Sequence, residues 1–155
     1  MGFKATVKCH LVRELTAPND DGTVSEMDRE NFTGLFEGNV SVHEGIVTIR
    51  YEGPDEMLCS FSFSKEEPEI LTFTQRFGKE NPDMILVLEE GKRHICLNNT
   101  GSETLEITTF CHRLHNTVQK NGKLLLSYAT ELHGFRVEKT LLTLELHKNE
   151  KYNKT

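Results

Sequence analysis

Histidine and cysteine residues lie near one another at two places in the sequence, and zinc is commonly bound by both side chains. His94 and Cys96 are separated by one residue, while Cys111, His112 and His115 follow in a later segment. A zinc site needs three or four such ligands to converge on one point. Adjacent residues of a strand point to opposite faces, so Cys111 and His112 cannot both face the same ion. We therefore predict that the chain binds no metal, and the sequence indicates no other cofactor.

The cysteines and carboxylates also lack the surroundings that catalysis needs. No G-x-S-x-G motif is present, and the eleven glycines are spread over turns instead of forming a phosphate-binding loop. Cys59 alternates with Met57 and Phe61 in an apolar pattern, which indicates packing rather than a nucleophile. The adjacent acids Glu66 and Glu67 flank a turn, where a solvated rim explains them. We therefore predict that the protein is not an enzyme.

Two tyrosines indicate a different kind of chemistry, the binding of a ligand. Tyr51 and Tyr128 occupy positions of an apolar alternation, which predicts that they are buried. A buried tyrosine hydroxyl needs a hydrogen-bond partner, and either Arg76 or Arg113 could supply one. An apolar pocket with a few polar groups at its mouth is the usual arrangement for a small ligand. Tyr51, Arg76 and Tyr128 are thus the candidates to anchor the polar end of an apolar or amphipathic molecule.

These side chains must be positioned by strands, because an alternation with a period of two residues dominates the chain. The segment from Met57 to Phe63 is the clearest case, since its apolar residues alternate with serines. Strand patterns cover residues 3–11, 47–51, 57–64, 70–77, 84–88, 94–97, 105–111, 124–132 and 137–146. Turn-forming pairs such as Asn121-Gly122 separate them. Nine or ten short strands predict an all-β barrel or, as the alternative, a β-sandwich.

Two stretches do not follow the alternation. Residues 15–22 contain Pro18 followed by three residues of Asn or Asp, which predicts a loop. Residues 25–30 could form one helical turn with Ser25 as its N-cap, or they could begin a strand over residues 32–36. No linker or internal repeat divides the chain, so residues 1–147 are predicted to form one domain. The polar residues 148–155 are predicted to be a disordered C-terminal tail.

The order of several short motifs is similar to that of a known family. The motifs are Gly34-x-Phe36, Ile49-Arg50-Tyr51-Glu52, Thr72-x-x-x-Arg76-x-Gly78, Thr100-Gly101 leading into Leu105-Glu106-Ile107, and Gly122-x-Leu124-x-Leu126-x-Tyr128. In this order they resemble the YwiB-like family of small bacterial proteins of unknown function, over residues 3–147. The resemblance implies a calycin-type, lipocalin-like β-barrel of about eight to ten strands, and it implies no reaction. This chain has Asn98 and Glu103 where the family usually has Tyr and Gly.

A barrel of about eight strands can be filled by its own side chains or can hold one small ligand. The apolar residues predicted to face inward are Cys9, Leu11, Ile49, Tyr51, Phe61, Phe63, Phe73, Leu105, Ile107, Leu124, Leu126, Tyr128, Leu142 and Leu144. Their large rings favour a filled interior, whereas the tyrosine hydroxyls favour a polar feature at one end. Two functions follow: a barrel that binds a small apolar or amphipathic ligand, and a filled barrel that acts as a protein-interaction or structural module.

The overall charge argues against one class of partner. The 155 residues contain 18 basic and 24 acidic side chains, a net charge of -6, and no basic stripe, so we predict no nucleic-acid partner. No run of 18 apolar residues is present, and the N-terminal residues lack the apolar core of a signal peptide. We therefore expect a cytoplasmic protein without a membrane partner, as a monomer or homodimer. In that compartment the four cysteines are expected to be reduced and buried.

Overall fold

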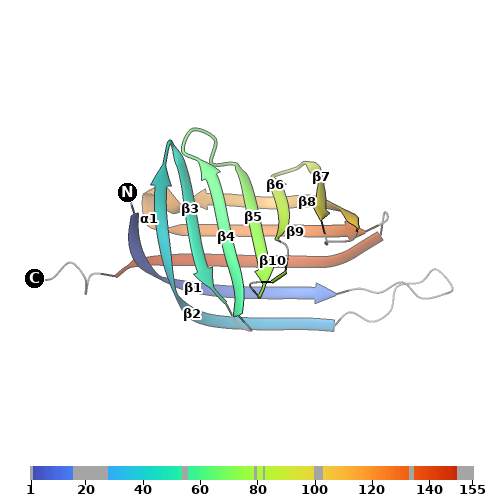
Figure 1. Ribbon diagram of the computed structural model, residues 1–155, viewed down its shortest axis with the longest axis horizontal. Helices are drawn as coiled ribbons and strands as arrows, with labels where there is room; N and C mark the ends of the chain where they lie inside the picture. The colour runs from blue at the N-terminus through green and yellow to red at the C-terminus, as the bar shows by residue number, and fades with distance from the viewer. Residues whose placement is uncertain are drawn as a thin grey trace, which may run out of the picture.

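The computed structural model describes residues 2–15, 28–53, 56–78, 80–81, 83–99, 103–132 and 135–149. These residues form ten β-strands and one short helix (Figure 1). The strands are β1 (Gly2–Leu15), β2 (Asp28–His43), β3 (Ile46–Glu52), β4 (Met57–Ser64), β5 (Ile70–Phe77), β6 (Met84–Glu89), β7 (Arg93–Asn99), β8 (Thr104–Thr117), β9 (Lys123–Leu132) and β10 (Phe135–Lys148). The helix α1 (Val118–Asn121) joins β8 to β9. In the described part of the chain, no helix has the length and apolar character needed to cross a membrane.

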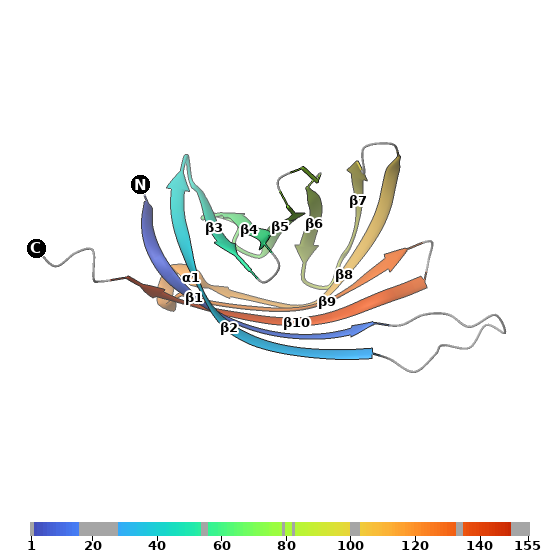
Figure 2. The same cartoon turned by 60° about the horizontal axis from the view of Figure 1, so that its bottom comes forward.

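All ten strands belong to one antiparallel sheet that is nearly closed into a barrel (Figure 2). The order of the strands is β6-β5-β4-β3-β2-β1-β10-β9-β8-β7, so most neighbours in the sheet are also neighbours in the sequence. The first and last strands of the chain pair with each other, from Ala5 opposite Lys148 to Leu15 opposite Glu138. The predicted all-β fold is thus confirmed, and its form is a barrel.

The core follows from the alternation of apolar and polar residues. In β4, Cys59, Phe61 and Phe63 are buried, while the serines between them lie on the other face. The residues predicted to face inward are all buried except Leu11 and Leu105, which are partly buried and pack against the core. Every strand contributes a buried apolar side chain to one hydrophobic cluster. Side chains therefore fill the middle of the barrel, as in other close-packed interiors.

β2 curves around the barrel (Figure 2), and other parts of the chain lie close to two of its glycines. A Cβ atom at Gly38 would lie 2.6 Å from the carbonyl oxygen of Arg50 and 2.8 Å from Cγ2 of Val7. At Gly34 it would lie 2.7 Å from the ring of Phe32. Gly38 thus leaves no room for a side chain against the backbone of β3, whereas at Gly34 only the outer ends of aromatic rings lie close.

The two halves of the barrel have strands of unequal length. β1, β2, β8 and β10 have 14 to 16 residues, whereas β3 to β7 have six to eight. β2 pairs with β3 only over residues 38–43, and the long strands extend past the short ones at one end (Figure 2). We call residues 10–15 of β1, 28–33 of β2 and 138–143 of β10 the overhang; these three segments pair with one another through β1.

Side chains, instead of a backbone ladder, join β6 to β7 and β8. Asn98 hydrogen-bonds with the backbone of Ile85. Sγ of Cys96 accepts a hydrogen bond from the N–H of Val87 at 3.3 Å, and Oγ1 of Thr109 donates one to the carbonyl of Val87 at 2.6 Å. We call these five residues the seam. Cys96, Asn98 and Thr109 are all buried, so the edge of β6 meets the inner faces of β7 and β8.

The ends of some segments differ from the predictions. Lys148, the first residue of the predicted tail, ends β10 because it pairs with Ala5, and the strand pairing thus continues one residue further. β8 extends beyond its predicted end at residue 111, and a bulge between Cys111 and Arg113 accompanies the burial of Leu114. Residues 28–30 begin β2, as the strand interpretation predicts. Residues 16–22, 25–27, 100–101 and 150–155, on which other predictions fall, lie outside the described residues.

Candidate functional site

Tyr51, one of the three predicted anchor residues, lies inside the barrel in a neutral network. It is buried on β3, and its side chain hydrogen-bonds with Cys9 of β1 and Cys59 of β4. Burial raises the pKa of Tyr51, and the two neighbouring thiols raise it further. Burial also raises the pKa of Cys59 to about 11. All three groups therefore keep their protons at neutral pH and stabilise one another within the core.

Tyr128, the second predicted anchor, is buried on β9 closer to the overhang. It lies opposite Thr140 of β10 and hydrogen-bonds with its side chain. Burial raises the pKa of Tyr128, and so does the charge of Glu138; the hydrogen bond with Thr140 and the charge of Arg13 act in the opposite direction. This tyrosine therefore lies within the electrostatic influence of two charged residues on the overhang.

Arg76, the third predicted anchor, lies on the other face of the sheet from the inward side chains. Phe73 faces inward on β5, so Gln75 shares its face and Arg76 lies on the outer face. Nε of Arg76 donates a hydrogen bond to Oδ1 of Asp83 at 2.6 Å, and this carboxylate raises the pKa of Arg76. Arg113, the alternative partner, is exposed on β8. The structure thus brings the two tyrosines inside and leaves both arginines outside.

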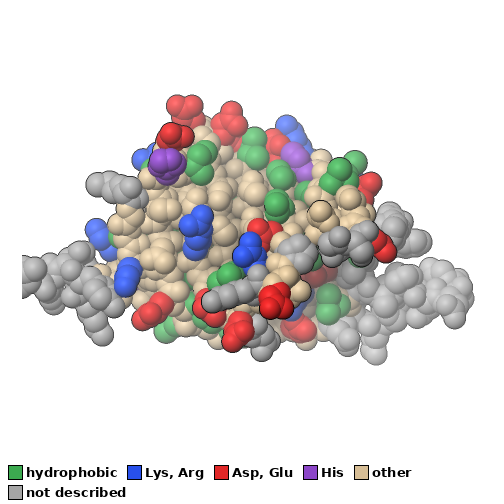
Figure 3. Space-filling view, viewed as in Figure 1, with side chains coloured by type: hydrophobic (Ala, Val, Ile, Leu, Met, Phe, Trp, Pro, Cys, Tyr) green, Lys and Arg blue, Asp and Glu red, His purple; other side chains and the backbone are tan. Residues whose placement is uncertain are grey.

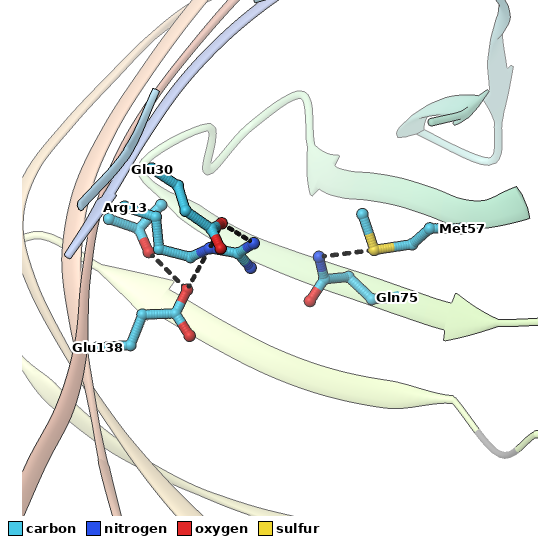
Figure 4. Close-up of polar contacts among 6 residues, drawn as sticks. Arg13, Glu30, Met57, Gln75 and Glu138 are labelled. Carbon is cyan, nitrogen blue, oxygen red and sulfur yellow. Dashed lines mark hydrogen bonds and ion pairs between the residues drawn. The ribbon is translucent and has the colours of Figure 1, made fainter. Parts of the chain in front are cut away.

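A different arginine, Arg13, lies on the overhang. We call this end of the barrel the mouth. Arg13 of β1 shares the inner face with Cys9, and it lies between Glu30 of β2 and Thr140 of β10 in the ladders. Nη2 of Arg13 is 2.5 Å from Oε2 of Glu30, and Nε is 3.6 Å from Oε1 of Glu138 (Figure 4). Burial by itself lowers the pKa of Arg13, but the hydrogen bond to Glu30 and the two carboxylate charges raise it overall. We call Arg13, Glu30 and Glu138 the mouth cluster.

The mouth cluster faces two uncharged side chains of the opposite wall. Nε2 of Gln75 lies 3.5 Å from Sδ of Met57, and both residues lie across from the cluster (Figure 4). Oγ1 of Thr140 donates a hydrogen bond to Oε1 of Glu138 at 3.1 Å. The exposed fractions of the Arg13, Glu30 and Glu138 side chains are 32%, 53% and 26%. The cluster is thus organised by hydrogen bonds and is also accessible to solvent.

Aromatic rings continue from the mouth into the core. The ring of Phe32 stacks on that of Phe36 with 5.9 Å between centroids, and Phe36 stacks on Tyr51 at 5.7 Å. Tyr51 in turn stacks on the fully buried Phe61. Phe32 and Phe36 are only partly buried, as is Leu11 on the neighbouring strand. The mouth therefore combines charged groups with apolar surface, which suits a molecule that has both characters.

Two hollows lie on the outside of the barrel. A groove of about 610 Å³ crosses β2 to β5 on the face that Figure 3 shows. Its lining includes two of the predicted anchor residues, Tyr51 and Arg76, together with Arg50 and Ser60. Another hollow of about 610 Å³ lies over β1, β8, β9 and β10. The first has mainly polar walls, and Asp83 already neutralises its Arg76. Neither hollow includes a residue of the mouth cluster.

The residues considered for metal binding have other partners. Nε2 of His94 lies 3.0 Å from Oε1 of Glu89, and Sγ of Cys96 belongs to the seam. Sγ of Cys111 donates to the carbonyl of Arg113. Over the residues that the structure describes, no three His, Cys, Asp or Glu side chains are grouped so that they could hold a metal ion. All four cysteines are free and buried, as expected for reduced thiols that pack in a core.

The sequence carries a signal for the mouth cluster, although the predicted site residues do not include Arg13, Glu30 or Glu138. Arg13 continues the alternation of the inward residues Cys9 and Leu11, and Glu138 continues that of Leu142. A charged residue at a position that the period assigns to the interior is unusual, because burying a charge costs free energy unless it is paired. If the two-residue alternation is continued to the end of each strand, it places both Arg13 and Glu138 on the inner face.

Comparison with known proteins supports the fold. No family model matches the chain, and no curated protein matches it. Among solved structures, the crystal structure of the YwiB protein from Bacillus subtilis matches with a TM-score of 0.59. The match covers 95% of this chain and 94% of that chain at 16% sequence identity. At this identity the likeness shows the fold alone, and the chain is therefore a small β-barrel similar to that of YwiB.

Proposed function

We propose that the protein is a non-enzymatic barrel that binds a small amphipathic molecule at the mouth cluster. The observation that carries this proposal is the position of Arg13, Glu30 and Glu138 on the inner face of a barrel whose other inner residues are mainly apolar. Such charges cost free energy to bury, so an arrangement that pairs them and leaves them accessible favours a binding role over a packing role.

The charges of the cluster indicate the polar end of the ligand. Two carboxylates surround one guanidinium, which gives a formal charge of -1 and leaves carboxylate oxygens that can accept further hydrogen bonds. A group that donates hydrogen bonds, such as an amine or a hydroxyl, is complementary to this arrangement. A carboxylate or phosphate would instead meet two like charges. The preferred ligand is therefore cationic or neutral at its polar end.

The apolar end of the ligand would lie on the overhang. Phe32, Phe36 and Leu11 present partly exposed apolar surface beside the cluster, and the core cluster closes the barrel beneath them. Because side chains fill the middle of the barrel, the ligand would lie at the mouth instead of passing through the interior. Tyr128 would contact the site from below through Thr140 and Glu138.

The raised pKa values of the thiols support a role without catalysis. Burial raises the pKa of Cys9, and it raises the pKa of Cys59 and of Cys111 to about 11 in each case. The nucleophilic form of cysteine is the thiolate, which these thiols do not populate at neutral pH. The cytoplasmic location and the lack of a nucleic-acid or membrane partner remain predictions from the sequence.

A titration that is read residue by residue tests the proposal. Octylamine and octanoate have the same chain length and opposite charge, so the two can be added in turn to ¹⁵N-labelled protein. We expect octylamine to shift the amide signals of residues 11–13, 30–32 and 138–140 in a saturable manner, and octanoate to do so at least tenfold more weakly. Glu30→Gln should weaken the octylamine effect, whereas Glu37→Gln, an exposed position of the same strand, should not. Equal effects of both amphiphiles, or shifts confined to the outer face, would contradict the proposal.

A second candidate function is that of a protein-interaction module. The filled interior favours it, because a barrel without internal space can act only through its surface or its mouth. In that case octylamine would shift no signals at the mouth, and a protein partner would protect surface amides from hydrogen exchange instead.

A further inference from the structure

One edge of the sheet lies open at β7. Among the described strands β7 pairs only with β8, and it forms one end of the sheet order. β6 does not cover its edge, because the edge of β6 meets the inner faces of β7 and β8 through Asn98, Cys96 and Thr109. An open strand edge presents backbone groups that can pair with another strand. The other end of the sheet, β6, already has backbone groups bound by the seam.

The outer face of β7 is apolar where a solvent-exposed edge is usually charged. The exposed fractions of Ile95 and Leu97 are 67% and 68%, and Ile85 of β6 is 42% exposed. Hydrophobic side chains appear on the part of the surface that β6 and β7 occupy (Figure 3). Natural edge strands commonly carry lysine or proline, which discourage pairing, and residues 93–99 contain neither.

We infer that β7 pairs in antiparallel fashion with β7 of a second copy of this chain, with the two-fold axis at Cys96. In this register Ile95 lies opposite Leu97 of the other copy, and Leu97 lies opposite its Ile95. Arg93 lies opposite Asn99 of the other copy, so the two Arg93 side chains do not face each other. In this register apolar side chains thus meet apolar side chains and no like charges meet, as a self-complementary isologous interface requires. This inference rests on the edge of β7 and is independent of the proposed ligand site.

The size of the contact sets the expected strength. A pair of seven-residue strands, with two apolar pairs on one face, is smaller than a standard protein interface. The dimer is therefore expected to exchange with monomer, with a dissociation constant in the range of about 1 µM to 1 mM. Sedimentation velocity of the full chain over this range of concentration should show a sedimentation coefficient that rises with concentration.

Two lysine substitutions at equally exposed leucines test the surface. Leu97→Lys should weaken the dimer at least tenfold, because a charge would be buried against the partner's Ile95. Leu35→Lys is the matched control, since Leu35 of β2 is also 68% exposed and lies on a strand that takes no part in the inferred contact. Both variants should keep the urea midpoint of the original chain, which shows that they fold. A chain that stays monomeric throughout, or a loss of dimer that is the same in both variants, would overturn the inference.

A cross-link tests the register. The double variant Ile95→Cys/Leu97→Cys places one new thiol opposite another across the two-fold axis, whereas each single variant places a thiol opposite an aliphatic residue. Mild oxidation should therefore give a covalent dimer of the double variant and at most traces with either single variant. Cross-linking of the single variants as efficient as that of the double variant would show a different register and contradict the inferred one.

Discussion

The side chain of Asn98 makes both of the backbone hydrogen bonds that a neighbouring strand would make to Ile85. Its Oδ1 accepts from the N–H of Ile85 at 2.6 Å, and its Nδ2 donates to the carbonyl of Ile85 at 3.2 Å. Asn98 is only 5% exposed, so few water molecules can replace it there. One amide side chain thus closes part of the barrel where the backbone ladder is missing.

Replacing Asn98 should destabilise the barrel more than its size suggests. Asn98→Ala would leave the N–H and the carbonyl of Ile85 without these partners, and each partly buried group left unpaired costs about 1–3 kcal/mol. We expect the free energy of unfolding to fall by about 2–4 kcal/mol, measured by urea denaturation. Asn31→Ala, at an exposed position of β2, should change it by less than about 0.5 kcal/mol. Equal effects of the two substitutions would show that the seam contributes no stability.

Gly38 and Gly34 should differ in their tolerance of a methyl group. Gly38→Ala would place its Cβ 2.6 Å from the backbone oxygen of Arg50, which cannot move without shifting β3. Gly34→Ala would meet the partly exposed rings of Phe32 and Phe36, which can rotate away. We expect a loss of about 3 kcal/mol at Gly38 and about 1 kcal/mol at Gly34, within the range for overpacking. Thermal unfolding of both variants checks this order, and a reversed order would contradict it.

The strands and the core could be predicted from the sequence because both depend on a local pattern. Phe61 and Phe63 alternate with serines, and one period of two residues sets both the strand and its buried face. The extra length of the long strands is harder to predict, because charged residues such as Arg13 and Glu30 interrupt the apolar pattern near the strand ends. How far a strand extends past its neighbour depends on the whole barrel, so no local pattern of residues predicts it.

The misplaced Arg76 and the seam show the two limits of such reasoning. Chemical type alone groups Arg76 with the tyrosines, but Arg76 lies three positions after the inward Phe73, and this odd offset places it on the opposite face. The role of Asn98 depends on which strands lie at the ends of the sheet, and no local pattern contains that information. Asn98 also occupies the position where the resemblance to the YwiB-like family leads one to expect Tyr.

The stability of the barrel should decrease steeply at alkaline pH. The pKa of Cys59 rises from 9.0 in the unfolded chain to about 11 in the fold, because of burial. Between pH 9 and 11 the unfolded chain therefore loses this proton while the folded chain keeps it, so the free energy of unfolding falls with rising pH. The stabilisation is complete well below pH 9, and roughly 2 kcal/mol of it is lost by pH 11 from this group. Urea midpoints measured from pH 8 to 11 would show it.

Cys59→Ala provides the control for this alkaline loss. The variant removes the thiol that titrates, so its urea midpoint should decline less between pH 9 and 11 than that of the original chain. The remaining decline comes from the other buried groups whose pKa burial raises, namely Cys9, Cys111, Tyr51 and Tyr128. Parallel declines in the two proteins would show that the thiol of Cys59 ionises alike in the folded and the unfolded chain.

The seam should control the reactivity of one cysteine in particular. Cys9, Cys59, Cys96 and Cys111 are all buried, so iodoacetamide at pH 8 should label each of them slowly in the folded protein and rapidly in urea. Cys96 lies two residues from Asn98, and its Sγ accepts the hydrogen bond from the edge of β6. Asn98→Ala should therefore open this part of the barrel first and raise the labelling rate of Cys96 by about tenfold or more relative to that of Cys9 and Cys59. Peptide mass spectrometry after timed labelling measures each rate. A uniform increase at all four thiols would mean that the barrel opens only as a whole and that the seam is not its weakest line.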